Sequence, residues 1–494
     1  MRSQNGLKSN NMANIEEFLL KDRSMLIAPA GFGKTYTITE CILLSNESKK
    51  HLILTHTHAG VASIKEKMKS QGVDFKKYNI ETICSFALQL TNNYHLNKDE
   101  IPNAENGNEY FGFAISTASK LLNSEPIKTV IKSKFSHLIV DEYQDCTQNQ
   151  HQFILLLSEV LKTHILGDPL QGIFGFKNST LVNMDSSIEM GEFKLNVQEL
   201  ITPWRWKNSN SMGLGTSIMS IRDLLLKKQT ININDYSNDI QIVIQPEANY
   251  TVTGSAYKQT IWKEINDPKT QSLLLIHPIS TSVQPRIKFL QQFSPLRLIE
   301  SIDDKDYYKY SILFDKNNGQ KLIDSILEFS KFLFLSNVID TWFNNGVIKK
   351  KRSPEDKIIA ESLQIEVNKL HANKSYDDIS RLINKIQYLP NNKCYRKDFI
   401  NEIISALQFA HKQNVSVYEA MKRNRDKIRR QGRSVKGKCI GTTLLTKGLE
   451  FDTVIVLNAH KFDDPKHFYV AISRACKKLI IISENPVIYP YQDL

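Results

Sequence analysis

Short apolar runs of strand length alternate along this chain with stretches of helical periodicity. The runs are rich in β-branched residues and are bounded by Gly, Pro, Asp or Asn, as buried parallel strands commonly are. Because a parallel strand is reached through a crossover connection, the alternation predicts the α/β class with two parallel-sheet domains. The runs are Met25–Ala28, Leu52–Thr55, Leu138–Val140 and Ile165–Gly167, followed by Leu273–Ile276, Cys439–Gly441, Val454–Leu457 and Leu479–Ile482.

Within the second set the pattern changes to successive amphipathic helices. Apolar residues recur at three- and four-residue spacing, as in Phe399, Ile403 and Leu407, which indicates one buried face. A larger all-helical insertion is therefore expected in the second domain, with its first long helix at Lys321–Phe343. A small helical insertion is expected in the first domain. The expected boundaries are 1–87 and 135–195 for the first domain, 88–134 for its insertion, 196–320 and 437–494 for the second domain, and 321–436 for the larger insertion.

The balance of charge indicates the kind of partner. Lys and Arg number 64 and Asp and Glu 52, so the 494-residue chain carries a net charge of +12. Nucleic acid is the commonest partner of a basic protein, and a basic surface without a ligand is the alternative. The six cysteines have no C-x-x-C spacing, which argues against a disulfide framework and a structural zinc site. No apolar run approaches the roughly 18 residues of a membrane span, so we expect a cytoplasmic protein with no membrane partner.

A glycine-containing loop follows the first predicted strand and precedes a predicted helix at Tyr36–Leu44. Glycines allow backbone N–H groups to turn toward phosphate oxygens at a helix N-terminus, whose dipole favours anions. Lys34 would reach the β- and γ-phosphates of a nucleotide, and Thr35 would bind Mg²⁺. Ala28 stands where the general pattern has its first Gly. The predicted phosphate-binding residues are Ala28, Pro29, Ala30, Gly31, Phe32, Gly33, Lys34 and Thr35.

An acidic pair ends the predicted strand Leu138–Val140. Nucleotide hydrolases hold their metal ion and orient the attacking water at such a strand end. Asp141 suits the Mg²⁺ shell, and Glu142 suits a general base that deprotonates the water. An acidic strand end in solvent is the alternative for the pair taken alone, but the phosphate loop upstream favours a nucleotide hydrolase.

Further segments follow the phosphate loop in a fixed order. They are Thr55–Ala59, Thr82–Ala87, Asp141–Asp145, Gly167–Lys177, Pro203–Arg205, Thr446–Val454 and Tyr469–Ala475. In sequence and in order they resemble the motifs of superfamily 1 DNA helicases of the UvrD/Rep/PcrA type. The resemblance implies two RecA-like domains and an ATP-dependent motor that moves 3′ to 5′ on single-stranded DNA.

The resemblance also implies residue roles. Gln171 would sense the γ-phosphate, and Arg205 and Arg474 would reach the same phosphate from the second domain. Trp204 would stack on the adenine, and Glu450 would approach the ribose. The implied catalytic residues are Lys34, Asp141, Glu142, Gln171, Arg205 and Arg474, with Thr35 and Asp141 as the Mg²⁺ ligands.

The DNA contacts that the resemblance implies combine hydroxyl groups with aromatic rings. Hydroxyls position the phosphate backbone, and rings stack on bases without reading sequence. For the two rings, ordinary core packing is the alternative. The implied DNA-binding residues are Thr57, Thr82, Ser85, Phe174 and Phe176. The basic run Met421–Lys438, with a net charge of +8, would hold duplex DNA or would be a solvated helix face.

The chain departs from this family in two respects. The family's Gln-containing element upstream of the phosphate loop is not recognisable, which leaves adenine selectivity open. The insertions are small, and in this the chain resembles the helicase-like subunit of the Gabija anti-phage system, which works with an ATPase-TOPRIM nuclease subunit. That resemblance implies a hetero-oligomer acting on single-stranded and end-bearing DNA. The alternatives are a DNA-sensing regulatory NTPase subunit that unwinds little, and a stand-alone DNA-repair helicase.

Overall fold

The computed structural model describes residues 14–102, 107–175, 180–300, 305–431 and 435–491. Its contacts divide the chain into two compact units. The first unit contains the residues up to Glu247 and those from Lys447 onward, and the second contains Ala248–Thr446. The first unit therefore includes the phosphate loop, the acidic pair and the C-terminal motifs together.

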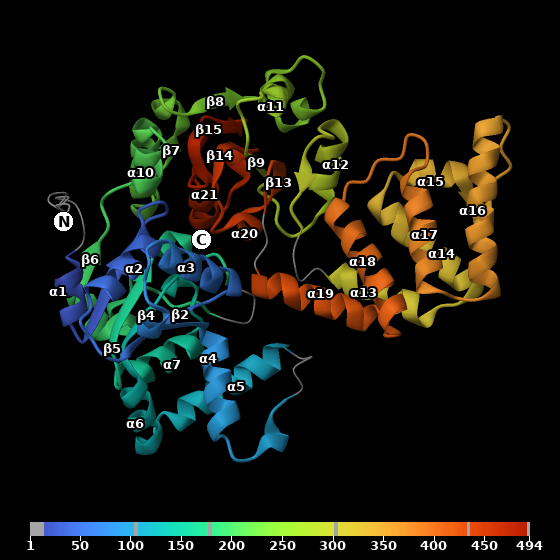
Figure 1. The fold of residues 1–494 in the computed structure, drawn as a ribbon. Helices are drawn as coiled ribbons and strands as arrows, with labels where there is room; N and C mark the ends of the chain where they lie inside the picture. Colours follow the sequence, from blue (N-terminus) through green and yellow to red (C-terminus); the bar gives the residue numbers. More distant parts are fainter. Residues whose placement is uncertain (1–13, 103–106, 176–179, 301–304, 432–434, 492–494) are drawn as a thin grey trace, which may run out of the picture. The chain divides into compact units, whose positions relative to one another are not determined.

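The first unit contains a six-stranded parallel sheet. Its strands are β1 (Arg23–Ile27), β2 (Lys50–Thr55), β3 (Tyr78–Thr82), β4 (Phe135–Val140), β5 (Lys162–Gly167) and β6 (Val197–Glu199), in the spatial order β3-β2-β4-β5-β1-β6. The helices along it are α1 (Ile15–Leu20), α2 (Lys34–Leu44), α3 (His58–Ser70), α4 (Ile83–Tyr94), α5 (Gly107–Leu121), α6 (Glu125–Lys134) and α7 (Gln148–Ser158). One face packs against α4, α5 and α7, and α1, α2 and α3 lie on the other (Figure 1). Because both faces are covered, the central strands are almost continuously buried.

Parallel pairing brings the carboxyl ends of the strands to one edge of this sheet. Ile27 of β1 is in register with Gly167 of β5, and Val140 of β4 with Ile165 of β5. The segments that follow these strands, beginning at Ala28, Asp141 and Asp168, therefore start side by side. This is the edge at which open parallel sheets bind ligands.

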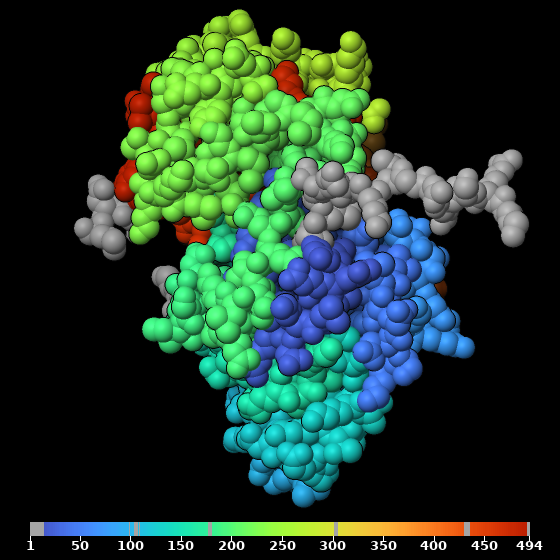
Figure 2. Space-filling view, turned by 90° about the vertical axis from the view of Figure 1, so that its left-hand side faces the viewer, coloured from blue at the N-terminus to red at the C-terminus, as the bar shows by residue number. Residues whose placement is uncertain are grey.

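The outer strand β6 leads the chain out of the first sheet. It pairs with β1 alone, and its exposed Glu199 and short length suit an edge strand. On the face shown in Figure 2, the green segment that contains β6 lies beside the blue N-terminal elements. Helix α8 (Ser187–Met190) precedes β6 in the chain. Helices α9 (Trp204–Asn208) and α10 (Met212–Leu226) follow it.

Each unit also contains three further strands that pair in parallel. In the first unit, β8 (Gln241–Ile244), β14 (Phe451–Val456) and β15 (Ala475–Ser483) pair in parallel, with α21 (Pro465–Ile472) between β14 and β15. In the second unit, β9 (Leu273–Ile276), β10 (Arg297–Leu298) and β13 (Lys438–Gly441) also pair in parallel. The remaining short elements are β7 (Ile231–Asn232), β16 (Val487–Ile488), α11 (Ala256–Asn266), α12 (Gln284–Gln292) and α20 (Thr443–Thr446).

The rest of the second unit is a helical cluster with its own core. Its elements are α13 (Lys305–Lys316), α14 (Gly319–Leu333), α15 (Ser336–Trp342), β11 (Phe343–Asn344), β12 (Val347–Ile348), α16 (Pro354–Ala372), α17 (Tyr376–Gln387), α18 (Lys397–Gln413) and α19 (Val417–Gln431). The seven helices lie together in Figure 1. Their apolar faces meet in one core, in which Tyr307, Phe329 and Phe399 are fully buried. The tyrosine comes from α13, so this helix packs with the cluster.

The expected α/β class with two parallel sheets and a helical insertion in the second is confirmed. The single helix expected at Lys321–Phe343 is wrong, because the structure has two helices there. Helix α14 ends at Leu333, whose carbonyl accepts a hydrogen bond from the backbone N–H of Tyr395. Phe334 and Leu335 continue the apolar pattern across the break, which hides it in the sequence. None of the described helices is long and apolar enough to span a membrane.

Candidate active site

The predicted phosphate loop connects β1 to α2 and is built on two glycines. Gly31 and Gly33 have φ angles of 81° and 88°, which strain any residue with a Cβ. A Cβ on Gly31 would also lie 2.8 Å from the Cβ of Arg205. The backbone N–H of Phe32 donates to the carbonyl of Pro29 at 3.2 Å, which closes the turn ahead of the helix. The loop therefore has the backbone of an anion cradle at a helix N-terminus.

Lys34 at the start of α2 contacts both residues of the acidic pair. Its Nζ lies 3.4 Å from Asp141 Oδ1 and donates a closer hydrogen bond to Glu142 Oε1. Glu142 has a left-handed backbone, with φ 56°, and its N–H donates to Asp141 Oδ1 at 2.9 Å. This conformation turns the two carboxylates of consecutive residues toward the same lysine.

Burial and charge act in opposite directions on the acidic pair. Burial alone would raise the pKa of Glu142, but Lys34 and Lys447 lower that pKa to about 2. For Asp141, burial prevails over Lys34, and the pKa is raised. With Lys34 on both carboxylates, Glu142 is therefore the weaker base of the two, and it can act as the base only after Lys34 has left it.

Two arginines predicted at the γ-phosphate approach this edge of the sheet. The backbone N–H of Arg205 donates to the carbonyl of Gly31 at 2.9 Å, and its Nη2 donates to Glu450 at 2.7 Å. Arg474 is almost fully buried, and its Nη2 donates to Gln171 Oε1 at 3.4 Å. Burial and the charge of Arg205 lower the pKa of Arg474 to about 10, so it still carries its charge at neutral pH.

Trp204 lies directly over the phosphate loop. A Cβ on Gly33 would approach its Cδ1 to 3.1 Å, and Lys207 Nζ lies 4.6 Å from its ring centre. The neighbouring Trp206 is fully buried and donates from Nε1 to the carbonyl of Ala475 at 2.9 Å. Trp206 therefore anchors the short helix that carries Trp204 and Arg205.

The predicted DNA-contacting hydroxyls lie at the ends of neighbouring strands and cap helices. Thr57 accepts from the N–H of Gly60 at 3.0 Å at the start of α3. Thr82 accepts from the N–H of Ser85 and donates to its Oγ at 2.7 Å at the start of α4. Thr55 and Thr82 are register partners, so both helix starts are at the same edge. These caps give the hydroxyls a local structural role, and their DNA role stays a prediction.

The aromatic pair predicted to stack on DNA is only partly described. Phe174 is half-buried, and Lys447 Nζ lies 4.6 Å from its ring centre. Phe176 lies outside the described residues. Of the basic run Met421–Lys438, residues 432–434 and the side chains of residues 429–431 also lie outside the description, and Arg425 is buried against Tyr307.

Several residues at the site were not singled out from the sequence. Lys447 pairs with Asp145 and donates to the carbonyl of Gln171. Burial raises the pKa of Asp145 to about 6 despite this lysine. The hydroxyl of Tyr469 accepts from the N–H of Ala30 at 3.1 Å. These residues lie within the motif segments recognised in the sequence. The motifs could therefore have pointed to them, but the sequence analysis assigned them no individual role.

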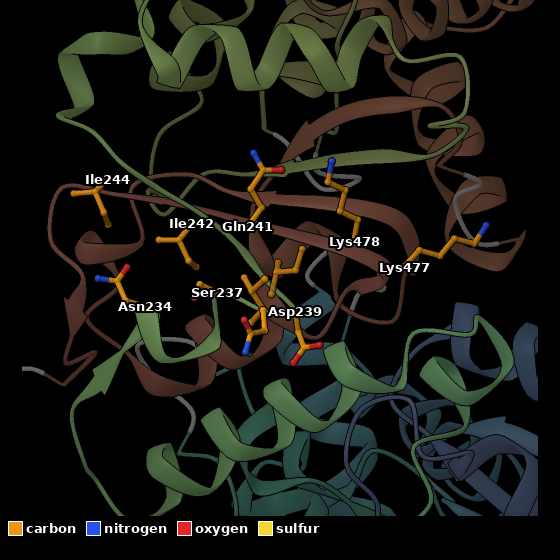
Figure 3. A pocket seen from close by; sticks show the side chains of 11 residues that line it. Asn234, Ser237, Asp239, Gln241, Ile242, Ile244, Lys477 and Lys478 are labelled. Carbon is orange, nitrogen blue, oxygen red and sulfur yellow. The ribbon is translucent and has the colours of Figure 1, made fainter.

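The surface hollow shown in Figure 3 is separate from this site. It has a volume of about 530 Å³. Its lining residues come from β8, from the segment just before β8 and from β15, and include Asp239, Gln241, Lys477 and Lys478. None of the predicted site residues lines it.

The chain is similar to known proteins over much of its length. A family model described as the UvrD/REP helicase N-terminal domain matches residues 9–111 and 103–190. Gabija protein GajB of Bacillus cereus (strain VD045) is 21% identical over 373 residues, covering 72% of this chain and 65% of the relative. The "Putative ATP-dependent DNA helicase R568" of Acanthamoeba polyphaga mimivirus is 25% identical over 247 residues, covering 43% of this chain and 34% of the relative.

The aligned parts span less than two thirds of the length of either relative. The family match begins ahead of the phosphate loop and extends past Gln171, so it contains the loop, the acidic pair and the strand ends described above. The N-terminal part of the chain is therefore similar to the UvrD/REP helicase N-terminal domain, and the similarity to the two relatives extends over a larger part of the chain.

Proposed function

We propose that this protein is an ATP-driven motor on single-stranded DNA. The observation that carries the proposal is the contact of Lys34 with Asp141 and Glu142 beside a glycine loop that Arg205 also contacts. A phosphate cradle, a lysine, two carboxylates and arginines from a second sheet are the parts that phosphoryl transfer to water requires. We also propose that the domain boundaries expected from the sequence delimit the two motor domains and their insertions.

During the proposed reaction, Lys34 exchanges its contact with Glu142 for a contact with the phosphates of ATP. The loop N–H groups and Lys34 bind the phosphates of ATP, so Lys34 leaves Glu142. The pKa of Glu142 then rises from its low value, and the carboxylate becomes able to accept a proton from the attacking water. Thr35 and Asp141 would hold Mg²⁺, which would supply positive charge at the phosphates.

The remaining residues position the nucleotide and stabilise charge. Arg205 and Arg474 stabilise the charge that develops on the transferred phosphoryl group. Trp204 stacks on the base, and Glu450, now paired with Arg205, approaches the ribose. Gln171 connects this site to the segment that carries Phe174. The affinity for DNA therefore changes with the nucleotide that is bound.

On DNA, Thr57, Thr82 and Ser85 contact the phosphate backbone, and Phe174 and Phe176 stack on bases. Such contacts ignore sequence, as a translocating protein requires. We infer 3′ to 5′ movement from the similarity to UvrD-like helicases. The basic run that begins in α19 supplies further phosphate contacts on duplex DNA.

The similarity to Gabija protein GajB extends the proposal to anti-phage defence. We infer that the chain acts in the cytoplasm in a hetero-oligomer with an ATPase-TOPRIM nuclease subunit, on single-stranded and end-bearing DNA. A stand-alone DNA-repair helicase would instead act as a monomer. Sizing of the purified chain with and without the nuclease subunit separates the two.

Strand displacement on a 3′-tailed duplex, measured beside ATP hydrolysis, tests the motor directly. We expect displacement that needs ATP and is lost in Lys34→Ala, while the exposed-surface variant Lys477→Ala keeps it. DNA-stimulated hydrolysis without displacement of a strand or of a bound roadblock would contradict the motor and favour a DNA-sensing NTPase.

A further inference from the structure

A buried carboxylate organises the side chains between the two halves of the candidate active site. Asp168 follows β5 and has no exposed surface. Its Oδ2 accepts from Gln171 Nε2 at 3.0 Å, and its Oδ1 accepts from the N–H of Leu170 at 3.2 Å. The same Oδ1 lies 3.1 Å from Arg222 Nη2 of α10. Asp168 is thus neutralised by an arginine that lies outside every motif recognised in the sequence.

Two amide side chains extend from Asp168 to the groups assigned to hydrolysis. On one branch, the Gln171 amide that binds Asp168 accepts from Arg474 at 3.4 Å. On the other branch, the N–H of Asp168 donates to Gln144 Oε1 at 3.0 Å, and Gln144 Nε2 donates to Glu142. An unbroken series of hydrogen bonds therefore connects the buried arginine to the general base through Asp168.

The space around this series is closely filled. A Cβ on Gly167 would lie 2.6 Å from Gln144 Oε1, so the Gln144 amide needs a glycine at the end of β5. Arg222 is itself 3% exposed, with its other terminal nitrogen 3.9 Å from Glu199 and its guanidinium 5.9 Å from the ring centre of Tyr469. Loss of the arginine would leave a buried carboxylate without its cation, and the carboxylate would have to move or take up a proton.

We propose that Arg222 is a positioning residue for nucleotide hydrolysis, which fixes Asp168 so that Gln171 and Gln144 hold Arg474 and Glu142 in their working arrangement. Arg222 itself touches no substrate in this account. The inference rests on the proposed function, because it assigns a role within the same reaction. Displacement of reacting groups by about 1 Å lowers rates by about 10²-fold, which sets the expected size of the effect.

The test is steady-state ATP hydrolysis with saturating single-stranded DNA. We expect Arg222→Met to lower kcat by about 10²-fold while the KM for ATP changes by only a few-fold, since Arg222 pairs with Asp168 and not with a phosphate-loop residue. Lys227→Met removes an exposed cation from the end of the same helix, and we expect it to keep the wild-type kcat. If the wild type hydrolyses ATP and kcat is unchanged in Arg222→Met, the role of Arg222 would be overturned and the proposed function would stand.

A double variant separates positioning from folding. Asp168→Asn added to Arg222→Met removes the uncompensated buried charge, so we expect thermal stability to return while kcat stays low. Recovery of both stability and wild-type kcat would assign Arg222 a structural role only and would overturn the proposal. Absence of hydrolysis in the wild type would overturn the proposed function itself, a result distinct from either outcome.

Discussion

Both units bury arginines, and they do so in different ways. In the helical cluster of the second unit, Arg396 is completely buried, pairs with Glu300 and lies 4.4 and 4.6 Å from the ring centres of Phe332 and Phe399. In the first unit, Arg474 is equally buried, but its partners are backbone carbonyls, a serine hydroxyl and the Gln171 amide. Within the described residues, no carboxylate accepts a hydrogen bond from Arg474.

The difference shows that burial of charge alone does not mark a functional site. Arg396 has a matched carboxylate and two aromatic faces, which is the arrangement of a structural cation. Arg474 is held by neutral groups at the edge where the phosphate loop and acidic pair lie, so its charge is available to an anionic ligand. We therefore expect substitutions in the two regions to affect different quantities.

The largest expected effect is on catalysis at Arg474. We expect Arg474→Ala to lower the rate of ATP hydrolysis by about 10³–10⁵-fold, the range typical of arginine fingers. Single-turnover hydrolysis measures this. Lys477→Ala, in which an exposed cation paired with Asp452 is removed, is the control. A fall of less than ten-fold in Arg474→Ala would make Arg474 another structural cation and remove the contrast with Arg396.

The next effect is on stability at Arg396. Arg396→Ala leaves Glu300 buried without its cation, so we expect it to lower the free energy of unfolding by about 3–5 kcal/mol. Urea unfolding of the full chain measures the loss. Arg297→Ala breaks a more exposed pair with Asp398 and should lose less than about 1 kcal/mol. Below the unfolding transition, ATP hydrolysis by Arg396→Ala should remain near the wild-type rate, and a large loss would contradict the division of roles.

A smaller effect concerns three stacked histidines beneath α1 in the first unit. His51 and His137 stack at 5.0 Å, and His137 and His164 at 5.3 Å. Burial and the neighbouring His137 lower the pKa of His51 to about 4. Above pH 6.5 the ring is neutral in both folded and unfolded chains. As pH falls from about 6.5 to about 4, only the unfolded chain takes up the proton, and His51 removes about 3 kcal/mol of stability.

Unfolding midpoints between pH 7 and pH 4 check this dependence. His51→Leu should flatten part of the acid decline, because one of the three rings no longer resists protonation. His411→Leu, at an exposed position on α18 of the second unit, should leave the decline unchanged. Equal acid sensitivity of wild type and His51→Leu would show that the histidine stack does not set the acid limit of the first unit.

The smallest effect is expected at the predicted DNA contact. Stacking is worth about 1–3 kcal/mol per base, so Phe174→Ala should weaken binding of single-stranded DNA by roughly 5- to 150-fold. Phe174→Tyr keeps a ring and should retain most of the affinity. Fluorescence anisotropy with a labelled oligonucleotide measures both. Unchanged affinity in Phe174→Ala would leave the ring a packing partner of Lys447.

The sequence was most informative where function depends on consecutive residues. The phosphate loop at Ala28–Thr35 and the pair Asp141–Glu142 are local patterns, and their strand-end positions followed from the apolar runs beside them. The short edge strand β6 was missed because Val197, Gln198 and Glu199 lack the apolar pattern of a buried strand. Edge position, which the local sequence does not encode, allows this polar composition.

Long-range partners were not predictable in the same way. Arg222 and Asp168 pair across 54 positions of the chain, and the helical spacing of Ile218 and Leu225, which places Arg222 on the apolar face of α10, does not identify that partner. Lys447 was quoted within a motif, but its contact with Asp145 is visible only in three dimensions. Local patterns therefore predicted the parts of the site, and tertiary packing decided which side chains connect them.

The most direct test of the central claim is the rate of ATP hydrolysis with and without single-stranded DNA, for wild type and Glu142→Gln. The account predicts strong stimulation by DNA in the wild type and its loss in the variant, in which the shape of the side chain is kept and the base is removed. Hydrolysis that ignores DNA, or that survives in Glu142→Gln, would contradict the account of a nucleotide site coupled to a DNA strand.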